Sequence, residues 1–211
     1  ELMKVLDDVS PGWRSRCKRV YITHADVDHC GLLSRLDTVR ICLNRKSAES
    51  LRRQLLGQPD FRENTELNLG YSKLSRIISG YAPPRANQFD ILDSNTPDEH
   101  DELLQIGNFS IADLDFEVFE GSGGHLPGEM IFACRKYGVI FTGDNLVNVS
   151  GFSAELSEFN SLAPYLMRSV NIDSRKATAV RNQVKKLIEE IRAGIRRPVL
   201  ICGGHGPICI S

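Results

Sequence analysis

The sequence lacks long hydrophobic runs and has almost no net charge. None of its apolar stretches reaches the roughly 18 residues that a membrane-spanning helix needs, so no membrane association is expected. The 26 basic and 27 acidic residues give a formal net charge of −1. Such a balance supplies no field that would steer nucleic acids or anionic membranes towards the protein. This argues against a nucleic-acid partner; the partner we expect is a small-molecule substrate, and composition leaves the oligomeric state open.

The six cysteines are scattered and form no C-x-x-C pair. This spacing excludes a small disulfide-rich scaffold and is typical of reduced, buried thiols in an intracellular protein. No signal peptide is recognisable at the first residue, Glu1, so a cytoplasmic location is expected. Cys30 and Cys202 lie near the candidate ligands described below and could border a site.

The chain length of 211 residues suits one domain with a sizeable core. We predict a single domain over residues 1–211 that contains a helical insertion at about 44–88. Within the insertion, residues 47–56 and 66–79 have leucine and isoleucine at helical spacing. The insertion would either cap a sheet face or cover a site as a lid or wall.

Hydrophobic periodicity predicts the remaining elements. Helices are predicted at residues 1–9, 31–36 and 174–193, the last with Ser174 as its N-cap and Gly194 at its end. An all-β stretch is predicted over residues 102–149, with a turn at Asn108. The predicted strands cover residues 19–23, 39–43, 103–106, 109–114, 116–119, 129–134, 139–142 and 198–202.

One short stretch, residues 23–31, carries an unusual density of charged and imidazole side chains. It follows the apolar residues 20–22, which suit the end of a strand. Buried charges are costly unless they are paired or bound to metal, so this density favours a metal site over packing. The four potential ligands are His24, Asp26, Asp28 and His29.

Three further polar residues stand alone in glycine-rich turns downstream: His125, Asp144 and His205. Glycine lets the backbone bend sharply and approach a ligand closely. Imidazole and carboxylate together suit zinc, iron or manganese. Seven candidate ligands are more than one tetrahedral ion can bind, but they suit two ions about 3.5–4 Å apart. A water shared by the two ions would have a pKa that falls to about 7. We predict two divalent metal ions, with zinc favoured and iron or manganese as alternatives.

The order of these motifs resembles that of the metallo-β-lactamase superfamily. That family carries H-x-H-x-D-H after a strand, then G-H-x-P-G, T-G-D and G-H-G turns. The counterparts here are residues 24–29, 124–128, 142–144 and 204–206. The resemblance implies an α+β fold, an αββα sandwich with the site at one edge between two mixed sheets. Because several strands usually precede the first motif, the first sheet is expected to be incomplete or completed by residues before Glu1.

Carried over by position, the resemblance implies two sets of metal ligands joined by one bridging carboxylate. Asp28 would also handle the proton and is the predicted catalytic group. The first metal would be held by His24, Asp26 and His125, the second by Asp28, His29 and His205, and Asp144 would bridge them.

Asp26 departs from the family motif, because it stands where the second histidine is expected. An acidic residue at this place is similar to flavodiiron proteins. Its harder oxygen donor would favour iron or manganese more than three histidines would. The alternative is that Asp26 orients a neighbouring histidine instead of binding metal.

Three functions follow as hypotheses. The first is a dinuclear metallo-hydrolase in which a metal-bound hydroxide attacks an ester, thioester, amide or phosphoester and Asp28 orients the nucleophile. The second, motivated by Asp26, is an iron-dependent oxidoreductase resembling flavodiiron proteins or sulfur dioxygenases. The third is a domain of this fold that binds without turnover.

Several other polar residues are weaker candidates for the site. His100 lies in an acidic stretch and is expected to be exposed rather than a ligand. Glu129 replaces a small hydroxyl residue common in the family and is expected to be a wall or surface residue. Asn145, Asn148 and Tyr165 could line a pocket, although solvated or capping roles suit them equally.

Overall fold

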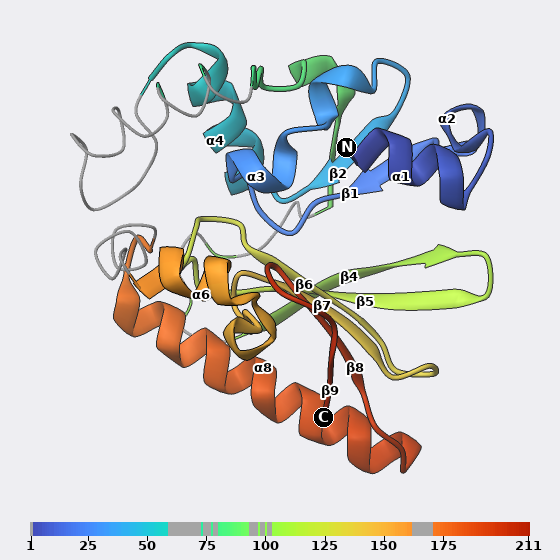
Figure 1. Ribbon diagram of the computed structural model, residues 1–211, viewed down its shortest axis with the longest axis vertical. Helices are drawn as coiled ribbons and strands as arrows, with labels where there is room; N and C mark the ends of the chain where they lie inside the picture. Colours follow the sequence, from blue (N-terminus) through green and yellow to red (C-terminus); the bar gives the residue numbers. More distant parts are fainter. Residues whose placement is uncertain are drawn as a thin grey trace.

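The computed structural model describes residues 2–58, 80–92, 103–161 and 171–211, together with residues 73, 77, 97 and 100. In these residues the chain forms two β-sheets that lie face to face, with helices on their outer sides (Figure 1). This arrangement confirms the predicted α+β sandwich. Apart from residues 73 and 77, the helix predicted at 66–79 lies outside the described residues, as does Tyr165. No described helix is both long and apolar enough to cross a membrane.

The elements follow one another in the order expected of a two-sheet sandwich. The helices are α1 (Leu2–Val9), α2 (Trp13–Arg16), α3 (Val27–Cys30), η1 (Leu33–Arg35), α4 (Arg45–Leu55), η2 (Ala86–Gln88), η3 (Val149–Gly151), α6 (Ala154–Ser161) and α8 (Ser174–Ile195). The strands are β1 (Arg19–Tyr21), β2 (Arg40–Leu43), β3 (Phe89–Ile91), β4 (Leu104–Ile111), β5 (Leu114–Glu120), β6 (Met130–Cys134), β7 (Val139–Gly143), β8 (Leu200–Gly203) and β9 (Cys209–Ile210).

The two sheets differ in size and direction. The first has the order β1-β2-β3 with all pairs parallel, so it is not the mixed sheet that was expected, and its third strand was not predicted. The second has the order β4-β5-β6-β7-β8-β9. Its first four strands are antiparallel, α8 then leads back to β8 parallel to β7, and β9 pairs antiparallel with β8.

The predicted turn at Asn108 is wrong. Asn108 lies inside β4 and pairs with Glu117, while the ladder is irregular only between Gln105 and Gly107. A β-bulge adds a residue to one strand without ending it. Strand β4 therefore continues through Asn108, and this polar residue does not mark a turn. The chain reverses instead at Ala112, whose φ of 53° is left-handed.

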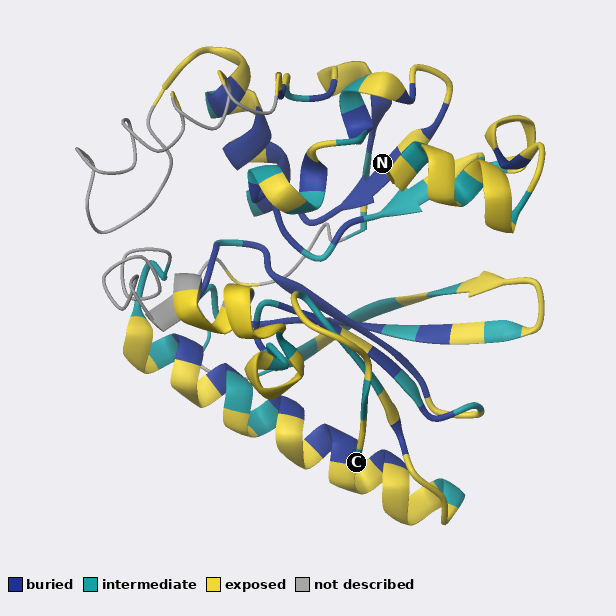
Figure 2. Cartoon of the chain, viewed as in Figure 1, coloured by how far each residue is buried: buried dark blue, intermediate teal, exposed yellow. Residues whose placement is uncertain are grey.

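Strand β6 shows how the layers are packed. Ile131 and Ala133 belong to the cluster that includes the buried stripe of α8. The alternate residues Met130, Phe132 and Cys134 belong to a second cluster, which reaches Tyr21 of the first sheet. Successive strand residues point to opposite faces, so a fully buried strand contributes to both layers. Figure 2 shows the same stripe on α8, with buried residues towards the sheet and exposed residues outward.

The two sheets are also joined by backbone at the edge that carries the site. The amide of Met130, the first residue of β6, donates to the carbonyl of Thr23 at 2.7 Å. Two residues before Thr23, Tyr21 stacks on Phe109 of the second sheet with ring centroids 3.7 Å apart.

Two predicted helices begin or end elsewhere than expected. Asp173, not Ser174, caps α8, because its carboxylate accepts from the amides of Arg175 and Lys176. The helix ends at Arg196, whose left-handed φ of 52° takes the role predicted for Gly194. The helix predicted at residues 31–36 is replaced by α3, which lies inside the His/Asp motif, and by the short η1.

We predict that α8 anchors the second sheet through its buried stripe. Ile191 is 1% exposed, so Ile191→Ala should lower the free energy of unfolding by about 2–5 kcal/mol, as for other buried isoleucine truncations. Lys186→Ala on the exposed side of the same helix is the control and should change it by less than about 0.5 kcal/mol. Urea unfolding of both variants measures the difference, and equal losses would contradict the packing described.

Candidate metal centre

The topology explains why distant residues meet. Strands β5, β7 and β8 run in the same direction, so their carboxyl ends lie at one edge of the second sheet. His125 follows β5, Asp144 follows β7 and His205 follows β8. The backbone bond from Met130 to Thr23 brings the end of the first sheet to this edge. The loop after β1 and the start of α3 then supply His24, Asp26, Asp28 and His29.

The first group of potential ligands consists of His24, Asp26, His125 and Asp144, whose ligand atoms all lie within 4.8 Å of one another. His125 Nε2 lies 3.4 Å from Asp26 Oδ2 and 3.5 Å from Asp144 Oδ2. His24 Nε2 lies 3.8 Å and 3.9 Å from the same two oxygens. Two imidazole nitrogens and two carboxylate oxygens thus face one small space.

The second group consists of Asp28, His29 and His205. His205 Nε2 lies 3.2 Å from Asp28 Oδ2, and His29 Nε2 lies 3.8 Å from it. The other oxygen of Asp144, Oδ1, lies 3.1 Å from His29 Nε2 and 3.5 Å from His205 Nε2. Asp144 therefore turns one oxygen to each group, as a bridging carboxylate would. The grouping is the one that the resemblance implied, and metal binding by these residues stays a prediction.

The two groups differ in burial. His24 and His125 are 1% and 3% exposed, whereas the side chains of Asp28 and His205 are 50% and 43% exposed. The first group thus forms the floor of the site, and the second group lies at its solvent side. The site is thus open to solvent on the side of Asp28 and His205.

The residues fit a metal cation. Within the described part of the chain, the buried Nε2 atoms of His24, His29 and His125 and Oδ1 of Asp144 have no hydrogen-bond partner. Buried polar groups in folded proteins are almost always satisfied, so unsatisfied atoms that converge on one space point to a missing partner. Lone pairs of imidazole and carboxylate are the donors that divalent transition metals accept.

Contacts on the outer side of two histidines leave their Nε2 atoms facing inward. Thr23 Oγ1 lies 3.0 Å from His24 Nδ1, and Asn171 Oδ1 lies 3.0 Å from His125 Nδ1. Such contacts fix the ring orientation and tautomer of a metal-binding histidine. Both contacts are therefore consistent with coordination through Nε2.

Electrostatics sets the protonation of the site without metal. Burial lowers the pKa of His24 well below its ordinary value, and the nearby His29 and His125 lower it further, so this imidazole is neutral. Burial alone would raise the pKa of Asp144, but contacts with His205 and His29 hold that pKa far below its usual range. Contacts with Asp144 and Asp28 raise the pKa of His205 to about 10. A metal at the second group would displace this proton, because a coordinating imidazole is neutral.

Glycine is required where the loops approach the ligands. A Cβ on Gly204 would collide with Asp144 Oδ1. Gly143 has a left-handed φ of 52°, and a Cβ there would lie 2.8 Å from Thr23 Oγ1, the atom that contacts His24. The glycines beside the candidate ligands thus let the loops pack directly against them.

Several secondary expectations are corrected. The His100 side chain is 7% exposed and its Nε2 lies 3.7 Å from the buried Glu120, so the expectation of an exposed histidine is wrong. Glu129 is also no surface residue, because it is 1% exposed. Its role was missed because one glutamate after a glycine carries no motif. Asn148 caps η3, and Asn145 is buried beside Glu129. Burial raises the pKa of the Cys30 thiol, which favours an inert side chain.

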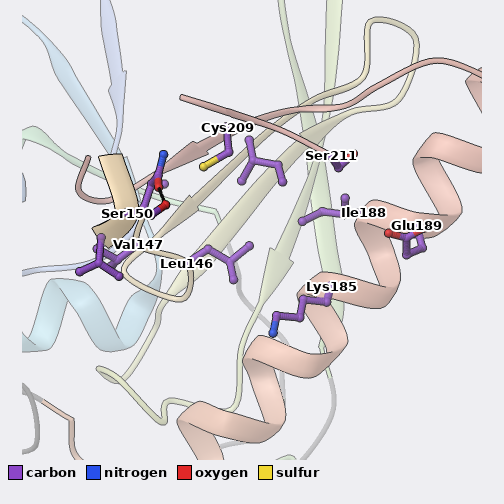
Figure 3. A pocket seen from close by; sticks show the side chains of 12 residues that line it. Leu146, Val147, Ser150, Lys185, Ile188, Glu189, Cys209 and Ser211 are labelled. Atoms are coloured by element: carbon purple, nitrogen blue, oxygen red, sulfur yellow. Dashed lines mark hydrogen bonds between the residues drawn. The ribbon is translucent and has the colours of Figure 1, made fainter. Parts of the chain in front are cut away.

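A separate cavity of about 410 Å³ lies between α8, η3 and the last two strands (Figure 3). Apolar side chains such as Leu146 and Ile188 form its wall, with Lys185 and Glu189 nearby. None of the seven candidate ligands lines it. One link to the site is Asn148, whose amide donates to the carbonyl of His205 at 3.0 Å. This cavity is therefore not part of the metal centre.

Comparison with known proteins gives the family. The family model of the metallo-beta-lactamase superfamily matches residues 14–189, so the chain belongs to that superfamily. No curated protein matches the chain.

Solved structures show the same fold at low sequence identity. AidC, a dizinc quorum-quenching lactonase, is 14% identical, with a TM-score of 0.56 over 98% of this chain and 63% of that chain. A metallo-beta-lactamase from Pontibacter korlensis is 12% identical, with a TM-score of 0.54 over 99% and 70%. TTHA1623 in a di-iron-bound form is 17% identical, with a TM-score of 0.52 over 100% and 80%.

The bridging position of Asp144 predicts that both groups depend on it. We expect the wild-type chain, loaded with Zn²⁺ and desalted, to retain about two ions. Asp144→Asn removes the charge that faces both groups and should retain less than about one. Asp37→Asn, an exposed aspartate after η1, is the control and should behave as wild type. Elemental analysis per chain measures this, and an Asp144→Asn variant with full metal content would contradict the bridge.

The raised pKa of His205 predicts a pH dependence of the metal-free protein. A histidine whose pKa is higher in the folded state stabilises the fold most below its unfolded value of 6.5. That contribution is lost as the pH rises towards about 10. Thermal unfolding in the presence of a chelator should therefore show wild type exceeding His205→Gln at pH 6, with the gap closing by pH 10. A gap that stays constant or widens would exclude this protonation.

Proposed function

We propose that this protein is a dinuclear metal-dependent hydrolase of small-molecule esters, thioesters, amides or phosphoesters. The observation that carries the proposal is the orientation of Asp144, which turns Oδ2 to His24 and His125 and Oδ1 to His29 and His205. One carboxylate between two sets of imidazole and carboxylate donors suits two cations that share a ligand. Neither a nucleic-acid partner nor a membrane is part of this proposal.

Each of the two groups of residues would bind one metal ion. His24, Asp26, His125 and Asp144 would hold one ion, and Asp28, His29, His205 and Asp144 the other. When bound, such ions lower the pKa of a coordinated water and polarise the bond to be attacked.

Asp28 is the candidate for proton handling. Its carboxylate is half exposed at the solvent side of the site, and its Oδ2 lies 3.2 Å from His205 Nε2. Contacts with His205 and His29 outweigh burial and lower its pKa, so it is ionised and can accept a proton. The exposed side of Asp28 then allows that proton to reach solvent. His24 and His125 are buried on the opposite side and serve to hold the floor of the site rigid.

The structural neighbours support hydrolysis. AidC is a lactonase that was solved with a product bound, and a lactone is a cyclic ester. Its dizinc state and the di-iron state of TTHA1623 occur on the same fold as this chain. Because the hydrolytic neighbour of the two is the dizinc protein, we favour zinc for a hydrolytic site and keep an ester or lactone bond as the first substrate to test.

Asp26 favours a second candidate, an iron-dependent oxidoreductase. Its Oδ2 lies 3.4 Å from His125 Nε2, so an oxygen donor occupies the first group where a third imidazole was expected. Oxygen donors shift metal preference towards iron and manganese. The electrons for turnover would have to come from the substrate, as in a dioxygenase, or from an electron-donating partner, as in a flavodiiron protein, since these side chains do not supply them.

The test combines metal identity with activity. The purified protein is assayed after loading with Zn²⁺, Mn²⁺ or Fe²⁺ on a panel of esters, lactones, thioesters, amides and phosphodiesters. We expect hydrolysis with Zn²⁺ and a decrease in kcat of at least about 100-fold for Asp28→Asn, as for the loss of a general base. Asp37→Asn serves as the control with unchanged rates. Metal found to be iron alone, with no hydrolysis in any loaded form, would favour the second candidate.

A further inference from the structure

Glu129 is a buried carboxylate that the hydrolytic proposal does not use. It lies between the turn that carries His125 and the first residue of β6, and it is 1% exposed. Charged side chains are rarely buried without compensation. Its surroundings therefore need a physical explanation.

Four N–H groups surround this carboxylate. Oε1 accepts from the amide of Gly123 at 3.1 Å and from that of Gly124 at 3.0 Å. Oε2 accepts from the amide of His125 at 3.3 Å and from Nδ2 of Asn145 at 3.4 Å. Burial raises the pKa of Glu129, while His125 and the backbone N–H donors oppose that shift, because the ionised carboxylate is the form that accepts on both oxygens without presenting a donor. Three successive backbone amides form a concave anion site for it.

The same carboxylate connects two of the loops that build the first group of ligands. Through the amides of residues 123–125 it fixes the backbone beside His125. Through Asn145 it reaches the residue that follows Asp144. His125 Nε2 and Asp144 Oδ2 lie 3.5 Å apart. The position of Glu129 therefore bears directly on the distance between two ligands of one ion.

The neighbouring glycine is fitted to this carboxylate. A Cβ on Gly121 would lie 2.7 Å from Oε1 and 2.9 Å from Cγ of Glu129. On its other side, the turn is held by α8 and the residues before it, because the amide of Asp173 donates to the carbonyl of Gly124 at 3.0 Å. Glu129 thus holds the inner side of a turn whose outer side is already fixed.

We propose that Glu129 is a positioning residue that sets the metal affinity of the group formed by His24, Asp26, His125 and Asp144. The inference rests on the proposed metal site, but the hydrogen-bond network that supports it can be tested without metal. Glu129 touches neither ion nor substrate. It acts by holding the amide of His125 and the side chain of Asn145 at a fixed position relative to each other, because both donate to its Oε2.

The first measurement uses the metal-free protein. Glu129→Gln keeps the shape of the side chain but places an NH₂ group among four donors. We expect the amide proton signals of residues 123–125 to move upfield in NMR spectra, because charge-assisted hydrogen bonds are lost. Glu120→Gln is the matched control, since Glu120 is equally buried but pairs with Lys46 at 2.8 Å. It should leave these three signals in place.

The second measurement is Zn²⁺ affinity by competition with a chromophoric chelator. Glu129→Gln should weaken one of two binding equivalents by about 10- to 100-fold, the usual effect of losing a group that orients a ligand. The other equivalent, and both equivalents in Glu120→Gln, should change by less than about threefold. If Glu129→Gln does not fold, Gly121→Ala displaces the same carboxylate and should give the same pattern.

The outcomes separate the two proposals. Unchanged amide signals and affinities in the Glu129 variant would overturn the positioning role. Shifted amide signals with equal weakening of both equivalents would overturn it too, because a general loss of structure would then be the cause. A wild-type protein that binds no Zn²⁺ would refute the proposed metal site, and the amide signals would still report whether Glu129 holds the turn.

Discussion

The central constraint is one carboxylate, with its side chain 14% exposed, that faces four imidazoles. The oxygens of Asp144 lie between 3.1 and 3.9 Å from the Nε2 atoms of His24, His29, His125 and His205. Such a cluster cannot all be charged or all be neutral at low cost in a poorly solvated space. In the metal-free protein the electrostatic cost is reduced by different protonation of the histidines. His24 on the buried side is neutral, and His205 on the exposed side is protonated. Two cations would compensate the carboxylates and the unsatisfied nitrogens together.

The sandwich supplies the precision that this cluster needs. Three parallel strand ends of one sheet carry His125, Asp144 and His205, while the first sheet carries the His/Asp loop. Glycine turns at these ends remove the side chains that would separate the loops, as at Gly143 and Gly204. Alternate buried residues of β6 pack against α8 on one face of the second sheet and towards the first sheet on the other face. Rigid elements with ligands at their ends hold a site better than loops alone.

Local patterns predicted the parts of this structure that depend on local chemistry. Periodicity gave α8 and the hairpin of β6 and β7 to within two residues, and the spacing of His, Asp and Gly selected the seven residues that converge. The failures lie where distant residues decide. Asn108 continues β4 because Glu117 pairs with it, Asp173 rather than Ser174 meets the first amides of α8, and Glu129 acquires its role only from a turn folded around it.

The backbone hydrogen bond between Met130 and Thr23 links the packing of the two sheets to the candidate metal centre. Thr23 precedes His24 and contacts its ring, while Met130 follows Glu129. If the two sheets slid past each other this bond would break, so we expect local opening of the sandwich and loss of the site to occur together. Solvent exchange of the Met130 amide would therefore slow when cations occupy the site. Residues far away in the core would in this way influence how often the candidate metal centre is disrupted.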